Sequence, residues 1–553
     1  MALTVVPLGG MGTVTQNLFL YELGNEILMV DCGIGFPDHK MPGVDILIPD
    51  VSYLVQQLED GKELVGIVFS HGHDDHIAAL PYLTEFIPNV PIYGSPLTAA
   101  FATQRLRDGG SDRVVTPMPD KKRFRIGTEF EVELIHVTHS VPDTKHVVIR
   151  TSEGILYHGS DFKFDPKPVD GRVSDLARMK EIGEEGVLCV LSDCLRVEQE
   201  DQIPSESLVG PVIQRLMSQT SGKCVVTLMS SHIHRIQQVV DASVHLGRKV
   251  TFVGRSVEQN VTEALSLGQL TVPEGVMLDK KNWDSVKESK LTMIIAGSQG
   301  QEGSSLTRAV YGEHREVQIK PQDTVIFSAG PIPGNELNFY GAIDELSRNN
   351  IQVYYPDIEP GLHQSGHASA LEQRQLVQLL KPRMLWPIGG ADRHRRLYQH
   401  MVATPEGYDP DRVIIPQNGD VVSFGNGRFS VPFRLTLRPQ AVDGLGVGDV
   451  GPRVLGDRRQ LSEAGMVVVI IPKDSRGGKN EYDFRRMQVI SHGFVFMKEA
   501  GEVVDFIKGI TRDIIMDSEK LKEQDLARTI ERKLQRKLYK TIQREPLVTV
   551  VFI

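Results

Sequence analysis

Short apolar runs bounded by turn-forming residues recur through the first 160 residues, in the pattern typical of β-strands. Gly9-Gly10 and Asp31-Cys32-Gly33 separate the earliest runs. The pattern predicts strands over residues 3–8, 18–23, 26–30, 67–69, 131–137, 147–150 and 155–158. Strands this frequent, with helical segments between them, predict an α/β fold in which sheets pack against each other with helices outside.

A helical repeat begins directly after His76. Ile77, Leu80, Leu83 and Phe86 follow at intervals of three residues, so they share one face of a helix. This spacing predicts one amphipathic helix packed on the sheet.

From residue 207 the pattern changes to a regular alternation of helices and strands. Helices are predicted at 209–217 and 235–246, and strands at 223–228, 249–253, 291–296 and 324–327. Such alternation predicts a parallel sheet in a domain of its own. A helix at 370–380 and a strand at 384–388 then close that unit. The alternation therefore predicts a separate α/β domain from residue 207 onward.

The C-terminal part begins with a linker. Residues 426–465 are rich in Gly, Pro and Arg, with some strand character. Residues 466–553 predict a small β-β-α-α-β domain, with strands at 466–472 and 488–497. One buried helical stripe is formed by Leu526, Ile530, Leu534, Leu538 and Ile542. The opposite face, either solvated or a contact for RNA or a subunit, carries Arg528, Arg532, Lys533, Arg536, Lys537, Lys540 and Arg544.

Composition is that of an ordinary globular protein of several domains, with 553 residues, 40% hydrophobic and 24% charged. A net charge of −10 does not favour nucleic-acid binding in general, although a local basic channel stays compatible with it. The four cysteines form no C-x-x-C pair, so a reducing cytoplasm is expected. The sequence has no leader and no apolar run of 18 residues, so neither export nor membrane insertion is expected.

The strongest chemical signal is the segment Ser70-His71-Gly72-His73-Asp74-Asp75-His76, which follows the apolar run at 64–69. Its H-x-H-x-D-H spacing delivers several nitrogen and oxygen donors to one point at a strand end. Neutral imidazole and carboxylate are ligands that zinc prefers. A simple helix cap is the alternative, but a cap needs one Asp or Ser and not three imidazoles.

Other donors at strand ends are expected to complete the site. His139 and Asp161 each end a predicted strand, and a carboxylate can bridge two cations. We predict a dinuclear zinc site, in which a shared water has a lowered pKa. The first metal would bind His71, His73 and His139, the second Asp75 and His76, and Asp161 both. His136 and His158 are expected to be core residues or to lie behind the ligands.

These residues resemble those of the metallo-β-lactamase superfamily, whose αββα sandwich carries this motif. Further segments are similar to ribonuclease J: residues 31–37, 44–50, 159–165, 254–256, 297–300 and 331–336. The resemblance covers nearly the whole chain. It implies a metallo-β-lactamase domain in two parts, residues 1–206 and 356–425, with a nested β-CASP domain, residues 207–355. A linker, residues 426–465, and a C-terminal domain, residues 466–553, would follow. It also implies 5′→3′ exonucleolytic and endonucleolytic cleavage of RNA, in mRNA decay and rRNA maturation.

The resemblance carries functional residues over one by one. Asp193 matches the acidic motif, and His367 matches a histidine near the scissile phosphate, acting as general acid or stabilising phosphate charge. With Asp75, they make up the expected catalytic set. His363, Ser365 and Gly366 match phosphate contacts on a Gly-rich loop. The start of a helix supplies further expected contacts, Ser231, His232, His234 and Arg235, for which a plain helix cap is the alternative.

One position departs from the family pattern P-x-H-G-E. The chain has Pro387-Ile388-Gly389-Gly390-Ala391, so Gly389 replaces a histidine that binds the second metal in the family. Three outcomes are open: a weaker second site, a substitute ligand from Asp392 or His394, or an inactive subunit.

The sequence therefore favours a zinc-dependent ribonuclease with two Zn²⁺ per chain, Mn²⁺ or Mg²⁺ serving as alternatives in activity. The resemblance further implies single-stranded RNA with a 5′-monophosphate as substrate, and homodimers or homotetramers formed through the C-terminal domain. Because of Gly389, a catalytically weak or inactive RNA-binding subunit is the second hypothesis. A hydrolase of small esters is disfavoured, because the inserted domain would have no role in it.

Overall fold

The structure is a computed structural model that describes residues 2–38, 40–332, 334–444, 446–473, 482–494, 501–518 and 521–553. It contains two compact units, Met1–Phe36 with Leu47–Pro439, and Pro37–Ile46 with Gln440–Ile553. Each is described by itself. None of the described helices has the length and apolarity needed to cross a membrane.

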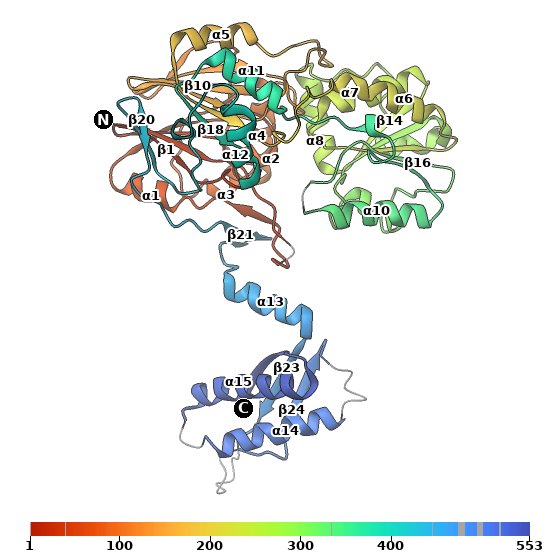
Figure 1. Ribbon diagram of the computed structural model, residues 1–553. Coiled ribbons are helices and arrows are strands. Elements are labelled where there is room, and N and C mark those ends of the chain that lie inside the picture. The colour runs from red at the N-terminus through yellow and green to blue at the C-terminus, as the bar shows by residue number, and fades with distance from the viewer. Residues whose placement is uncertain are drawn as a thin grey trace. The chain divides into compact units, whose positions relative to one another are not determined.

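Two sheets face each other at the centre of the first unit (Figure 1). The larger has the order β20 (Arg428–Ser430), β19 (Val422–Gly425), β1 (Leu3–Pro7), β2 (Phe19–Leu23), β3 (Glu26–Val30), β5 (Glu63–Val68), β6 (Ile92–Gly94), β7 (Thr116–Pro117). The smaller has the order β18 (Met384–Ile388), β12 (Val187–Asp193), β11 (Gly154–Gly159), β10 (Lys145–Thr151), β9 (Phe130–His136), β8 (Phe124–Ile126). Side chains from both sheets, including Phe19, Val68, Leu134 and Trp386, form one buried core between them.

Helices cover the outer faces. Met179 and Ile182 of α5 (Leu176–Glu185) and Leu376 of α11 (Ala370–Leu380) pack against the six-stranded sheet. Helices α1 (Ser52–Glu59) and α4 (Pro96–Asp108) contact strands of the larger sheet. The predicted sandwich of sheets with outer helices is thereby confirmed.

The single helix predicted after His76 is wrong. The chain forms two short helices instead, α2 (Asp74–Ile77) and α3 (Leu80–Leu83), and Phe86 is 45% exposed. Pro81 lies in the first turn of α3, where its missing N–H needs no acceptor. Because proline cannot continue a preceding helix, it starts a new one there.

The chain leaves the sandwich after β12 and returns at β18, which pairs in parallel with β12. Between them lies a parallel sheet of order β14 (Lys249–Val253), β15 (Leu291–Ile295), β13 (Cys224–Thr227), β16 (Thr324–Phe327), β17 (Gln352–Tyr354). Its helices are α6 (Val209–Ser218), α7 (Ile233–His245), α8 (Arg255–Ser266), α9 (Ser305–Val310) and α10 (Glu336–Arg348). Helix α12 (Asp392–Tyr398) follows β18.

The second unit has a central sheet of order β24 (Gln488–His492), β23 (Met466–Ile471), β25 (Leu547–Phe552). Helices α14 (Gly501–Met516) and α15 (Glu523–Ile542) precede β25, and the α15 stripe Ile530, Leu534, Leu538 is buried against this sheet. The order β-β-α-α-β agrees with the prediction. Strand β24 ends at His492, and residues 495–497 of the predicted strand lie outside the described residues.

The segment predicted as a linker contains a regular helix, α13 (Pro452–Ala464), after the short strands β21 (Gln440–Asp443) and β22 (Gly446–Val447). Pro452 stands in the first turn of α13, which explains how a proline-containing segment starts a helix. The short strand β4 (Ile46–Ile48) precedes α1.

Candidate metal centre

Sheet topology brings the predicted donors to one edge. Strands β9 and β11 both run antiparallel to β10. Strand β12 runs parallel to β11, and β18 runs parallel to β12. The carboxyl ends of β9, β11, β12 and β18 therefore lie at the same edge, followed by His139, Asp161, Asp193 and Gly389. The loop after β5 adds the H-x-H-x-D-H segment from the facing sheet.

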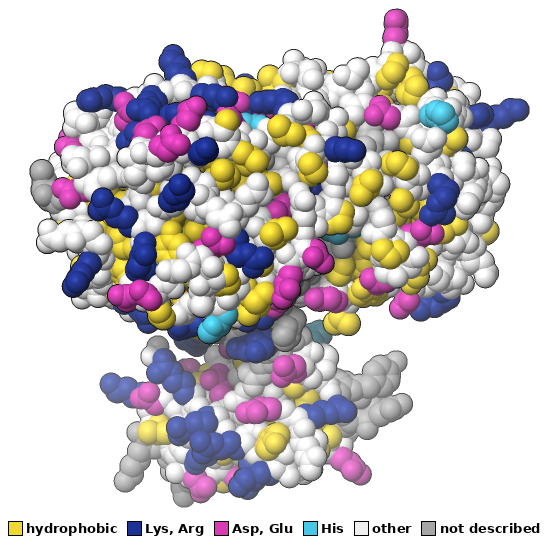
Figure 2. Space-filling view, turned by 45° about the horizontal axis from the view of Figure 1, so that its top comes forward, with side chains coloured by type: hydrophobic (Ala, Val, Ile, Leu, Met, Phe, Trp, Pro, Cys, Tyr) yellow, Lys and Arg dark blue, Asp and Glu magenta, His cyan; other side chains and the backbone are white. Residues whose placement is uncertain are grey.

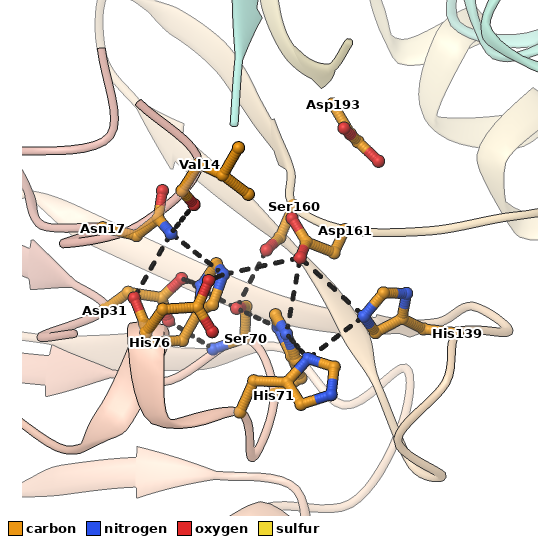
Figure 3. Close-up of polar contacts among 12 residues, drawn as sticks. Val14, Asn17, Asp31, Ser70, His71, His76, His139, Ser160, Asp161 and Asp193 are labelled. Atoms are coloured by element: carbon orange, nitrogen blue, oxygen red, sulfur yellow. Dashed lines mark hydrogen bonds and ion pairs between the residues drawn. The ribbon is translucent and has the colours of Figure 1, made fainter. Parts of the chain in front are cut away.

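Three imidazole nitrogens converge at this edge. His73 Nδ1 lies 3.1 Å from His71 Nε2 and 3.2 Å from His139 Nε2. Asp161 Oδ2 is 3.7 Å from each of these two Nε2 atoms, and Figure 3 shows His71 and His139 turned toward it. Ligands around a tetrahedral zinc are about 3.3 Å apart, because Zn–N bonds are about 2.0–2.1 Å long. The four donors fit one such cation.

The second predicted group is also assembled. His76 Nε2 lies 3.7 Å from Asp75 Oδ2 and 3.6 Å from Asp161 Oδ2. Asp75, His76 and Asp161 thus form a second group able to hold a cation, and Asp161 belongs to both predicted groups. Three carboxylates surround the His76 imidazole, so the site concentrates negative charge where a cation would bind.

Residues behind the ligands fix the ring orientations. His76 Nδ1 donates to Asp31 Oδ2 at 2.7 Å, and His139 Nδ1 donates to the carbonyl of Gly366 at 2.7 Å. Ser70 Oγ lies 3.0 Å from His71 Nδ1 and donates to Asp31 Oδ2. These contacts turn the other nitrogen of each ring toward the metal groups, as is usual around metal-binding histidines.

Electrostatics keep the first ligand set neutral. Burial lowers the pKa of His73 to about 3 and brings the pKa values of His71 and His139 well below their usual range. Neutral imidazole is the form that binds metal. Burial raises the pKa of Asp75 to about 6. Burial acts the same way on Asp161, but protonated His367 and His76 nearby hold its pKa well below the usual range.

His367 and Asp193 form a hydrogen-bonded pair beside the predicted ligands, and together with Asp161 they make a third group of donors able to hold a cation. His367 Nδ1 donates to Asp193 Oδ2 at 2.8 Å, and His367 Nε2 faces Asp161 Oδ2 at 4.0 Å. Burial opposes protonation of His367, but the carboxylates of Asp193 and Asp161 raise its pKa to about 9. The imidazole thus has one nitrogen fixed and the other directed toward the metal groups.

Gly389 borders the same carboxylates. Its φ is +66°, and a Cβ there would lie 3.7 Å from both Asp161 Oδ1 and Asp193 Oδ1. A side chain at this position would therefore point at the second metal group. The strand register explains why Gly389 lies next to Asp193, because Asp193 of β12 pairs with Ile388 of β18.

Neither proposed substitute reaches the cluster. Asp392 pairs with Arg395 at 3.0 Å, and its side chain is 62% exposed. His394 Nε2 lies 3.7 Å from Glu198 Oε1. Within the described part of the chain, neither belongs to a group of donors that could hold a metal.

Arg235 and His232, which the resemblance placed among the phosphate contacts, are buried. Arg235 makes two hydrogen bonds with Glu206, at 2.8 and 2.6 Å, and two more with Ser328 O and His363 Nδ1. His232 Nε2 lies 3.5 Å from Glu206 Oε1. The Arg235 guanidinium therefore supports His363 from behind and has no face free for a phosphate.

The rest of the predicted phosphate loop lies near the metal groups. Ser365 Oγ accepts from His367 N at 3.1 Å. A Cβ at Gly366 would come within 2.9 Å of His139 Nδ1, so only glycine allows this close approach. Ser231 is half-buried just before α7, and His234 Nε2 lies 3.4 Å from Asp170. His136 is hydrogen-bonded to the carbonyl of Arg172, and His158 to the hydroxyl of Tyr21. Neither belongs to a group of donors that could hold a metal, within the described residues.

Replacing Glu206 by Gln is expected to destabilise the first unit by about 3–5 kcal/mol, because it leaves a buried guanidinium without its countercharge. Burial by itself would raise the pKa of Glu206, but Arg235 and His232 hold this pKa well below its usual range. The stabilisation is therefore present above about pH 4.5 and is lost as the pH falls through the lower, folded-state pKa.

Urea unfolding of the full chain measures the effect. The control is Glu359→Gln, because Glu359 pairs with the exposed Arg215 and should matter little. Equal midpoints for both variants would contradict the buried pair.

Sequence reasoning missed three contributors: Asp31, Glu206 and Asn17. The Asn17 amide lies 3.1 Å from His76 Nε2 and also donates to the carbonyl of Asp75. Asp31 is fully buried, has φ of +61° and bonds both His76 and Ser70. For Asp31, the sequence offered one signal: an acidic residue directly after an apolar strand, in Asp31-Cys32-Gly33.

Comparisons with known proteins bear on the whole chain. Family profiles match residues 11–169 (metallo-beta-lactamase superfamily), 221–346 (ribonuclease J, beta-CASP domain) and 453–553 (ribonuclease J C-terminal domain).

Similar curated proteins include ribonuclease J 1 of Streptococcus pyogenes, 33% identical over 98% of this chain and 96% of that protein. Ribonuclease J of Thermus thermophilus is 37% identical over 90% of this chain and 85% of that protein. Ribonuclease J2 of Bacillus subtilis is 30% identical over 99% of this chain and 98% of that protein.

A crystal structure of an Enterococcus faecalis protein of unknown function shares the fold. Its TM-score is 0.54 at 14% identity, over 77% of this chain and all of that one.

Proposed function

The chain belongs to the ribonuclease J family of RNA-processing nucleases, and on that basis we propose that it is a metal-dependent ribonuclease. It would hydrolyse RNA phosphodiester bonds as a 5′→3′ exonuclease with endonuclease activity, in mRNA decay and rRNA maturation. The convergence of His71 Nε2, His73 Nδ1 and His139 Nε2 with Asp161 is the observation that carries this proposal.

Zinc is the proposed resident metal, with Mn²⁺ or Mg²⁺ as alternatives in activity. The donor set of imidazoles and carboxylates suits zinc. When bound, two divalent cations lower the pKa of a water and stabilise both oxygens of an in-line displacement. His71, His73 and His139 would hold one cation, Asp75 and His76 the other, and Asp161 both.

His367 is proposed to serve the leaving oxygen. Asp193 holds its Nδ1, so Nε2 is the nitrogen free to donate a proton. Ser365 accepts a hydrogen bond from His367 N and so helps to place this histidine. Ser365 and Gly366 are proposed as phosphate contacts, because a Gly-rich, hydroxyl-bearing loop suits anionic oxygens. His363 and Ser231 are proposed to contact phosphates farther along the RNA, with Arg235 and His232 as supports.

The test is incubation of the purified chain with 5′-monophosphorylated RNA and zinc or manganese. The proposal expects 5′-phosphate products. Intact RNA with metal bound would overturn it, and would favour the second candidate, a regulatory RNA-binding subunit, for which the replacement at Gly389 is the observation.

We expect Gly389→His to raise the affinity of the second metal position roughly tenfold to a hundredfold, the range found when groups beside metal ligands change. A Cβ there has ordinary contacts, and histidine tolerates positive φ better than most residues. Metal analysis after equilibrium dialysis measures the second equivalent.

Gly389→Ala is the matched control, because it introduces the same backbone strain without an imidazole. Identical metal binding by the two variants would show that position 389 does not serve the second metal.

The C-terminal domain is proposed to form homodimers or homotetramers, and the protein to act in the cytoplasm. Membership of the ribonuclease J family supports both proposals. Light scattering of the full chain measures the first.

A further inference from the structure

One face of α15 is strongly basic although the chain as a whole is acidic. From Arg528 to Arg544 the sequence has seven Lys and Arg residues and one Glu, in a chain of net charge −10. We call this surface the basic face of α15; all its members are exposed: Arg528, Arg532, Lys533, Arg536, Lys537, Lys540 and Arg544. The buried stripe on the opposite side packs on the sheet and fixes this face outward.

These charges have little compensation within the described residues. Arg544 donates to the carbonyl of Phe494, and no ion pair joins the other six to a described acidic group. Glu531, the acid among them, is used elsewhere, since its Oε1 accepts from Val550 N at 3.1 Å. By contrast, Arg123 and Arg178 of the first unit share Glu133 and Glu185.

The spacing of the cations suits a polyanion. Arg528, Arg532, Arg536 and Lys540 recur every four residues, which is about 6 Å along the helix axis. Figure 2 shows several Lys and Arg side chains close together on the second unit. A regular row of unpaired cations is complementary to a chain of phosphates, with affinity supplied by counterion release.

An open hollow lies at the C-terminal end of this face. Its volume is about 560 Å³, and its lining includes Tyr539 of α15, Arg544 just after that helix, and Arg459 of α13. Two carboxylates, Glu463 and Glu545, also line it. The Tyr539 side chain is 57% exposed. An exposed aromatic ring beside guanidinium groups is the combination on which unpaired bases stack.

We propose that the basic face of α15 binds phosphates of single-stranded RNA, and that the adjoining hollow takes a base stacked on Tyr539. This RNA contact is separate from the metal centre. It deepens the proposed function, because the polyanion presented to a ribonuclease is its own substrate.

The test compares full-length variants binding a fluorescent, mixed-sequence 30-nucleotide RNA in EDTA, so that binding is read without hydrolysis. The test variant combines Arg532→Gln, Lys533→Gln, Arg536→Gln and Lys537→Gln. Glutamine keeps helix propensity. The control removes four exposed cations of the first unit, with Lys122→Gln, Arg125→Gln, Lys180→Gln and Lys381→Gln.

The test variant is expected to bind at least tenfold more weakly, with a salt dependence shallower by about 3 in log–log slope, since each phosphate contact contributes about 0.7. The control should stay within twofold. Tyr539→Ser should weaken binding about fivefold or more, while Tyr539→Phe, which keeps the ring, should not.

Unchanged affinity and salt slope in the test variant would overturn the proposal. So would a loss of molecular mass in light scattering that accounts for the weaker binding, because the face would then be a subunit contact. These results are independent of cleavage: if metal-loaded protein left RNA intact while the variants bound as expected, the proposed function would fail and the RNA surface would stand.

Discussion

His73→Ala is expected to slow RNA hydrolysis at least about a thousandfold and to remove the first metal equivalent. His73 Nδ1 lies between the other two imidazole nitrogens, so its loss opens the most complete ligand set. Metal ions supply several kcal/mol of transition-state stabilisation, and about 4 kcal/mol corresponds to a thousandfold in rate. Hydrolysis of 5′-labelled RNA and metal analysis of the same samples measure the two effects.

His245→Ala is the matched control, because this histidine is exposed at the end of α7, outside the metal groups. It should keep both metal content and rate. A His73→Ala variant that retained its metal and a rate within tenfold would contradict the assigned ligand set.

His367→Gln is expected to lower kcat on RNA by about 10²- to 10⁴-fold, the usual contribution of a general acid. The cations at the two predicted positions should stay bound, because their proposed ligands are left in place. The reason is geometric: Asp193 holds Nδ1, and Nε2 is left to face the reacting groups. Bis(p-nitrophenyl) phosphate provides the second readout, since its leaving group needs no proton. On that ester the loss should be tenfold or less.

The exposed His400→Gln is the control and should behave as the wild type. An equal loss on RNA and on the activated ester would assign His367 the other role, stabilisation of phosphate charge.

Local pattern was enough to predict much of the fold and the metal donors. The H-x-H-x-D-H segment is contiguous, and His139 and Asp161 each follow a strand, so strand ends at one sheet edge explain their meeting. The order of the C-terminal elements was likewise set by clear hydrophobic periodicity.

The local sequence pattern could not predict contacts between segments that lie far apart in the chain. Asp31 meets His76 across 45 residues, and the carbonyl of Gly366 meets His139 across 227. Arg235 looks like a surface residue in the sequence, because its burial depends on Glu206. The orientation of Gly389 depends on the pairing of β18 with β12.

The most direct test is an anomalous-scattering map, recorded at the zinc edge, from crystals of the zinc-loaded full chain. We predict a strong peak bounded by His71 Nε2, His73 Nδ1, His139 Nε2 and Asp161, and a weaker one among Asp75, His76 and Asp161 next to Gly389. A map without a peak among the three imidazoles would contradict the metal centre on which the proposed reaction depends.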